Sequence, residues 1–187
     1  LEADLLKALP FKLTTAQHRA WSEISSDLEK SFPMNRLLQG DVGSGKTIVA
    51  ALAAARVMDH GYQAAVMAPT EILAEQHYLK MKEWFEPLGV RITWLSGSLK
   101  SKDKRQAQER IESGEAQLII GTHALIQESV NFSKLGIAII DEQHRFGVRQ
   151  RLEIQQRLGS ELFYCHQLMM SATPIPRTLA MTYYADL

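Results

Sequence analysis

Eight consecutive residues, Gly40-Asp41-Val42-Gly43-Ser44-Gly45-Lys46-Thr47, have the spacing of a phosphate-binding loop. Glycines let such a loop turn so that successive backbone N–H groups point at one anion, and the following helix adds the positive end of its dipole. Lys46 would reach the outer phosphates of a nucleoside triphosphate, and the Thr47 hydroxyl would ligate Mg²⁺. The loop therefore predicts a site for a nucleotide and its metal ion.

A second motif, Asp141-Glu142-Gln143-His144, is acidic and lies downstream of that loop. By itself it could be no more than the polar end of a buried strand. Its combination with a phosphate-binding loop favours another interpretation. Asp141 would help to hold Mg²⁺ through water, and Glu142 would orient or deprotonate the water that attacks the phosphate. The two motifs together predict nucleotide hydrolysis.

Buried strands and amphipathic helices are expected to position these motifs. Continuous apolar runs are typical of strands that are buried on both faces of a parallel sheet, whereas the alternation over 90–94 predicts a strand nearer an edge. Helices are predicted over 46–59, closed by Gly61, and along a stripe over 73–88. The sequence thus predicts an α/β fold with a mostly parallel central sheet. The apolar runs cover 37–38, 64–68, 118–120, 137–140 and 168–170.

Polar residues follow each of the five apolar runs. Open parallel sheets bind ligands beyond the carboxyl ends of their strands, so these polar clusters are expected to gather on one edge of the sheet. Besides the phosphate-binding loop and the acidic motif, the clusters are Pro69-Thr70-Glu71, Gly121-Thr122-His123 and Ser171-Ala172-Thr173.

Simpler structural roles are open for several of these residues. Thr14 and Gln17 have the spacing of a capping box, in which both side chains satisfy backbone groups at the start of a helix. Pro69-Thr70 is typical of a helix cap, and Ser171-Ala172-Thr173 of a turn. His123 would ordinarily be a strand-end histidine.

His77 and a charged stretch can also be explained by structure alone. His77 would ordinarily lie on a helix face, and no histidine–cysteine spacing suggests zinc. The charged stretch over 100–112 is typical of a solvated helix, with contact to nucleic acid as the alternative.

The bulk composition is that of a soluble globular domain. The 187 residues are 45% hydrophobic, and Lys+Arg and Asp+Glu both count 21, so no global positive charge indicates a nucleic-acid binder. Cys165 is the only cysteine, which suits a reducing cytoplasm. No secretory leader and no apolar run of about 20 residues is present. These features predict a cytoplasmic protein. The chain begins at Leu1 without a methionine, so we expect it to be an excised piece.

In this order, the polar clusters resemble the motifs of the first motor lobe of superfamily 2 helicases and translocases. The resemblance runs from about Leu9 to Leu187. It implies a three-layer RecA-like P-loop NTPase domain over 1–187, with a helical segment over 1–30. The matching motifs are the Q motif at 14–17, motif I at 40–47, motif Ia at 69–71, motif Ib at 121–123, motif II at 141–144 and motif III at 171–173.

Two longer stretches narrow this resemblance. Those over 141–148 and 172–179 are similar to RecG branch-migration helicases and to transcription–repair coupling translocases. The stretches over 39–47 and 67–71, together with Gln143, favour the RecG family. That family implies a bacterial, cytoplasmic motor that uses ATP and Mg²⁺ to push forked DNA and Holliday junctions. The alternative is a coupling translocase, whose partner would be RNA polymerase. A metabolic kinase would not need motifs II and III together.

The resemblance also implies roles for single residues. Gln17 would read the adenine edge of ATP, and Phe11 would pack against its ring. The residues that would couple the nucleotide state to DNA are Gln143, His144, Ser171 and Thr173. The DNA-binding residues would be Pro69, Thr70, Gly121, Thr122 and His123.

Such a motor needs more than residues 1–187. A second lobe supplies the remaining helicase motifs and an arginine finger, and a wedge domain grips branched DNA; neither is expected within this sequence. We therefore expect these residues alone to bind ATP or ADP weakly, with negligible hydrolysis.

Overall fold

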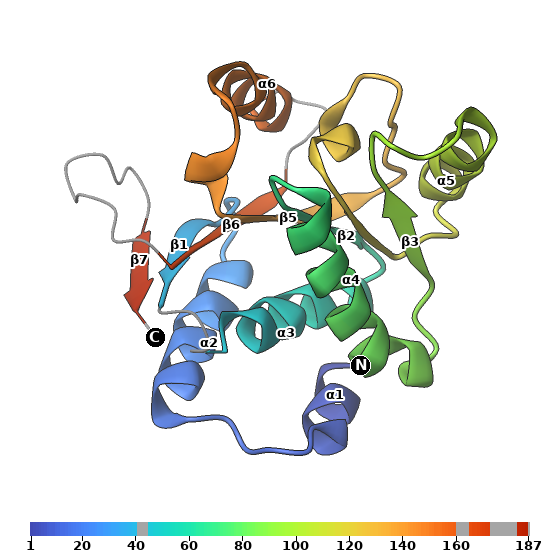
Figure 1. Cartoon of the computed structure of the whole chain (residues 1–187). Helices are drawn as coiled ribbons and strands as arrows, with labels where there is room; N and C mark the ends of the chain where they lie inside the picture. Colours follow the sequence, from blue (N-terminus) through green and yellow to red (C-terminus); the bar gives the residue numbers. More distant parts are fainter. Residues whose placement is uncertain (41–44, 160–164, 173–182, 187) are drawn as a thin grey trace.

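The computed structural model describes residues 1–40, 45–159, 165–172 and 183–186. Within these ranges the strands form one seven-stranded sheet in the order β3-β4-β2-β5-β6-β1-β7 (Figure 1). Every strand pair in this sheet is parallel. The prediction of an α/β fold around a mostly parallel sheet is confirmed.

Six of the seven strands coincide with the apolar segments of the sequence, and β3 lies at an edge as its alternation predicts. The seventh, β7, pairs with β1 at the other edge and was not predicted. The strands are β1 (Asn35–Gln39), β2 (Gln63–Met67), β3 (Ile92–Leu95), β4 (Leu118–Gly121), β5 (Leu135–Asp141), β6 (His166–Ser171) and β7 (Tyr183–Asp186).

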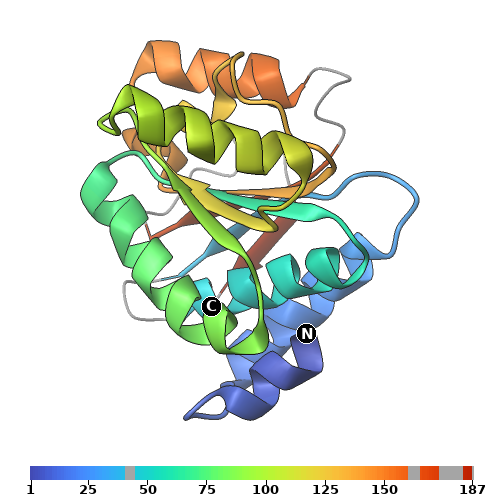
Figure 2. The ribbon, with the colours of Figure 1, turned by 90° about the vertical axis from the view of Figure 1, so that its right-hand side faces the viewer.

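Helices cover both faces of the sheet and complete three layers (Figures 1 and 2). One face carries α1 (Glu2–Ala8), α2 (Thr15–Leu28), α3 (Lys46–Asp59) and α4 (Glu71–Phe85). The other face carries α5 (Ser101–Ser113) and α6 (Val148–Leu158). In the described ranges, short 3₁₀ turns follow strands or helices: η1 (Glu86–Leu88), η2 (His123–Ile126) and η3 (Gln143–Arg145). The implied three-layer fold is confirmed.

Alternate residues of the central strands enter two separate cores. Ala64 and Val66 of β2 pack towards α1–α4, whereas Ala65 and Met67 pack towards α5 and α6. The alanine-rich helix α3 is buried almost all round, because α1 and α2 cover the side that faces away from the sheet. This burial holds the first turn of α3 firmly at the end of β1.

A buried ion-pair network fixes α2 to the start of the sheet. Arg36 in β1 donates from Nε to Oδ2 of Asp27 at 2.7 Å and from NH1 to Oε2 of Glu23 at 2.9 Å. Burial alone would raise the pKa of Asp27, but hydrogen bonds from Arg36 and Lys30 outweigh burial and hold this pKa below its ordinary value.

Replacing Asp27 with asparagine is expected to lower the free energy of unfolding at pH 7 by about 3 kcal/mol, because Arg36 loses its buried partner. The depressed pKa of Asp27 stabilises the fold above pH ~4, and this stabilisation is lost as pH falls below that value. Urea unfolding at pH 7 and pH 3 measures both effects. The variant should lose less stability than the wild type between the two pH values; an equal loss would contradict this role.

Candidate nucleotide site

The phosphate-binding loop connects β1 to α3 at the carboxyl edge of the sheet. Gly40 donates its N–H to the carbonyl of Ser171 at 3.1 Å, which ties the start of the loop to the end of β6. At its other end Gly45 has a left-handed backbone (φ 83°), and α3 begins with Lys46 and Thr47. Lys46 Nζ donates to the carbonyl of Gly40 at 2.7 Å, so the two ends of the loop are joined. The predicted residues Asp41, Val42, Gly43 and Ser44 lie outside the described residues.

The acidic motif stands two strands away on the same edge, since β5 neighbours β6 and β6 neighbours β1. Asp141 is the last residue of β5 and is buried. Its Oδ2 lies 2.6 Å from Nε2 of His77, which comes from α4. His77 was not among the predicted site residues. The sequence showed that it belongs to the buried stripe of a helix, but not which strand end it meets.

Glu142 has a left-handed backbone (φ 49°, ψ 48°), which costs a non-glycine residue roughly 1–3 kcal/mol. Three contacts hold it there. Its N–H donates to the carbonyl of Met170 at 2.9 Å, and Oε1 accepts the N–H of Ala172 at 3.1 Å. Oε2 lies 3.3 Å from Nε2 of His144. The carboxylate is thus fixed between motif II and the residue after β6.

A cavity of about 510 Å³ brings these residues together. Phe11, Gln17, Lys46 and Thr47 line it together with the acidic pair. Further lining residues that the sequence did not single out come largely from α4. The predicted residues that line it are Phe11, Gln17, Gly45, Lys46, Thr47, Asp141 and Glu142. The others include Leu73, Gln76, His77, Lys80, Trp84, Arg145 and Met170.

Gln17 makes the predicted capping box and also reaches the phosphate-binding loop. Its N–H donates to Oγ1 of Thr14 at 3.1 Å, and its Oε1 accepts the N–H of Thr14 at 2.8 Å. Nε2 of the same amide donates to the carbonyl of Gly45 at 3.4 Å. A Cβ at position 45 would overlap this amide nitrogen, so Gly45 is required by its neighbour as well as by its backbone angle.

The residues predicted to bind DNA lie at the ends of β2 and β4, on the same edge but outside the lining of the nucleotide cavity. Thr70 caps α4, because its Oγ1 accepts the N–H of Leu73 at 3.2 Å. Thr122 is the N-cap of η2, and Nε2 of His123 lies 2.7 Å from Oε2 of Glu153 in α6. A Cβ at Gly121 would overlap the carbonyl oxygen of Leu95. Gly121 therefore has a packing role between β3 and β4 whatever it binds.

Three of the residues predicted to couple nucleotide and DNA lie in the part of the chain that the structure describes. Ser171 ends β6 and is buried, Gln143 opens η3, and His144 faces Glu142. Thr173 lies outside the described residues.

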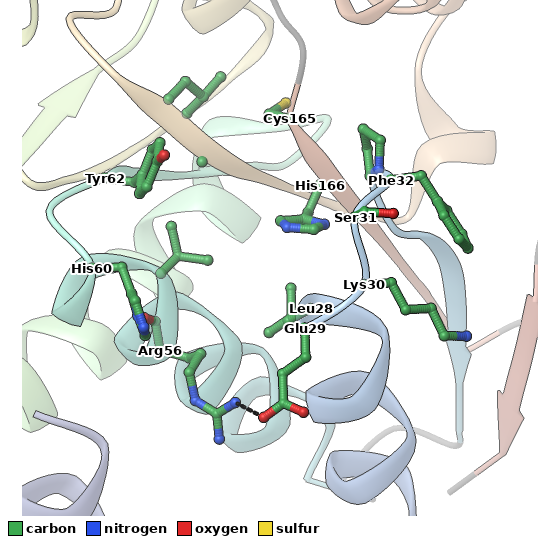
Figure 3. A pocket seen from close by; sticks show the side chains of 14 residues that line it. Leu28, Glu29, Lys30, Ser31, Phe32, Arg56, His60, Tyr62, Cys165 and His166 are labelled. Atoms are coloured by element: carbon green, nitrogen blue, oxygen red, sulfur yellow. Dashed lines mark hydrogen bonds and ion pairs between the residues drawn. The ribbon is translucent and has the colours of Figure 1, made fainter.

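A second cavity, of about 580 Å³, lies at the amino ends of β5 and β6, on the opposite edge of the sheet (Figure 3). Arg56 and Glu29 form an ion pair at 3.7 Å on its wall. Burial raises the pKa of the Cys165 thiol to about 12, so this side chain is a neutral thiol at physiological pH. None of the predicted site residues lines this cavity. Within the described part of the chain, no helix is long and apolar enough to cross a membrane.

The fold is that of a RecA-like P-loop NTPase domain. A family model described as DEAD/DEAH box helicase matches residues 14–182, and the chain belongs to this family.

Among helicases, the chain is similar to RecG proteins. The chain is 57% identical over all 187 residues to the ATP-dependent DNA helicase RecG of Haemophilus influenzae and spans 27% of its length. A solved structure of RecG bound to a three-way DNA junction is 46% identical, with a TM-score of 0.81 over 97% of this chain and 24% of that one. A helicase from Sulfolobus tokodaii, described as a hypothetical ATP-dependent RNA helicase, shares the fold at 17% identity, with a TM-score of 0.74 over 100% of this chain and 56% of that one. The resemblance to the RecG family is confirmed.

Proposed function

We propose that these residues are the first RecA-like motor lobe of an ATP-dependent helicase that remodels branched DNA in the bacterial cytoplasm. The observation that carries the proposal is the meeting of Lys46 and Thr47 with Asp141 and Glu142 at one cavity. The ends of β2 and β4, which hold the predicted DNA contacts, lie on the same edge of the sheet. The RecG relative solved on a three-way junction supports branched DNA as the substrate.

The cavity residues would divide the work of ATP hydrolysis. Lys46 would neutralise charge on the outer phosphates, and Glu142 would orient and deprotonate the attacking water. The Thr47 hydroxyl and the Asp141 carboxylate fit Mg²⁺, which prefers oxygen ligands and keeps several of its waters. When bound, this ion would neutralise negative charge on the phosphates.

The contacts around Glu142 suggest how hydrolysis would reach the DNA. Its carboxylate accepts the N–H of Ala172, and the carbonyl of Ser171 accepts the N–H of Gly40 at the start of the phosphate loop. Hydrolysis or release of the γ-phosphate would therefore shift the residues at the end of β6. Gln143 and His144 would pass this change on, and Pro69, Thr70, Gly121, Thr122 and His123 would grip the DNA.

The test uses the full-length protein and a three-way DNA junction with a fluorescent strand. We expect ATP-dependent strand separation that is faster on the junction than on a linear duplex of equal length. Lys46→Ala serves as the inactive control. Equal rates on both DNAs would contradict the preference for branched DNA, and normal hydrolysis by the Lys46→Ala protein would contradict the site.

Gln17→Glu separates the capping role of Gln17 from its proposed adenine contact. A glutamate can still accept the N–H of Thr14 but cannot donate to adenine or to the carbonyl of Gly45. We expect a nearly unchanged melting temperature and a 10- to 100-fold weaker affinity for ATP, about 1–3 kcal/mol. The affinity for GTP should change less.

Gln17→Ala is the matched control, because it removes the capping contact as well and should lower the melting temperature. Equal losses of ATP and GTP affinity in Gln17→Glu would show that Gln17 does not read the base.

A further inference from the structure

His77 is a buried imidazole that contacts one of the proposed metal-site carboxylates. The side chains of His77 and Asp141 are only 7% and 9% exposed, and their Nε2···Oδ2 distance is 2.6 Å. The other buried residues of α4 are apolar or aromatic: Ala74, Met81, Trp84 and Phe85. His77 therefore brings an imidazole from the buried stripe of α4 to the carboxylate at the end of β5.

The contact fixes the orientation of the Asp141 side chain. The backbone of Asp141 ends β5, and Asp141 lines the cavity. With the carboxylate oxygen as the acceptor, this contact requires the tautomer of His77 that carries a proton on Nε2. A hydrogen bond to a charged acceptor at this length is strong and directional. It restrains rotation about the last side-chain bond of Asp141.

We propose that His77 is a positioning residue that holds Asp141 for the Mg²⁺ of the bound nucleotide; this proposal rests on the proposed function. Mg²⁺ demands near-ideal octahedral geometry and tolerates little displacement of its ligands or of the groups that hold its waters. Carboxylates at metal sites are in turn held by hydrogen bonds, whose loss typically costs 10- to 100-fold in metal affinity. His77 and Asp141 line the same cavity as Lys46 and Thr47, so the pair lies at the proposed nucleotide site.

A matched pair of amide variants in the full-length protein tests this role. In His77→Gln, the side-chain amide nitrogen can reach about the position of the histidine Nε2. In His77→Asn, the side chain is too short for its amide nitrogen to reach Asp141. The measurement is the affinity of the protein–ADP complex for Mn²⁺ as a probe of the Mg²⁺ site, by electron paramagnetic resonance, together with the affinity for ADP without metal.

We expect His77→Asn to weaken Mn²⁺ binding by 10- to 100-fold and His77→Gln by less than about 5-fold. Metal-free ADP should bind all three proteins within about 2-fold. Met81→Ala, on the same buried stripe, is the control for lost packing and should leave Mn²⁺ affinity unchanged.

Two results would overturn the proposal in distinguishable ways. If His77→Asn and His77→Gln bind Mn²⁺ equally, His77 only fills space and the nucleotide site stands. If the wild-type ADP complex binds no Mn²⁺, the positioning role and the proposed metal site fail together.

Discussion

Glu142→Gln is expected to lower kcat for ATP hydrolysis by the full-length protein by about 10²- to 10⁴-fold, while ATP still binds. Glutamine has nearly the same shape and can still accept the N–H of Ala172, so the link between motif II and the end of β6 persists. It cannot take a proton from water. The loss should therefore appear in kcat and not in the affinity for ATP.

Single-turnover hydrolysis and the binding of a fluorescent ATP analogue separate these two quantities. Glu83→Gln, on the exposed side of α4, is the matched control and should hydrolyse ATP at the normal rate. A normal kcat in Glu142→Gln would show that another group is the general base. Loss of ATP binding would show that Glu142 mainly maintains the shape of the cavity.

Residues 1–187 alone are expected to hydrolyse ATP at least about 10³-fold more slowly than the full-length protein. The described wall of the cavity contains Lys46, Lys80 and Arg145, but the RecG resemblance assigns the arginine finger to a second lobe. An open cavity on one lobe also leaves the phosphates in contact with water, which weakens every charge interaction there.

Steady-state ATPase assays of both proteins, with and without junction DNA, measure this difference. Calorimetry with ADP must show that the lobe is folded and binds nucleotide, so that slow turnover is not a folding defect. Hydrolysis by residues 1–187 that DNA stimulates to the rate of the full-length protein would contradict the need for a second lobe.

The strands that carry the site could be predicted because a parallel sheet covered on both faces leaves an apolar signature in the sequence. Asp141 and the phosphate-binding loop follow such runs directly, so their meeting on one edge followed from the fold class. The capping box of Thr14 and Gln17 was also predictable, since its geometry is local.

Contacts between separate elements could not be predicted in this way. The contact of His77 with Asp141 depends on how α4 is rotated against the sheet, which a helical stripe alone does not define. The overlap that a side chain at Gly121 would make with Leu95 depends on the register of β3 and β4. The reach of Gln17 to Gly45 depends on how α2 packs against α3.

Helix α4 connects the two proposed binding regions as a single stiff body. Thr70 caps its first turn, and His77 lies seven residues further on, about 10 Å along the axis. A strand of DNA that tilts the first turn would also displace the imidazole from Asp141. The free energy of such coupling is reciprocal. Binding of Mg²⁺ and nucleotide would therefore change the affinity for DNA by the same factor by which DNA changes the affinity for Mg²⁺ and nucleotide.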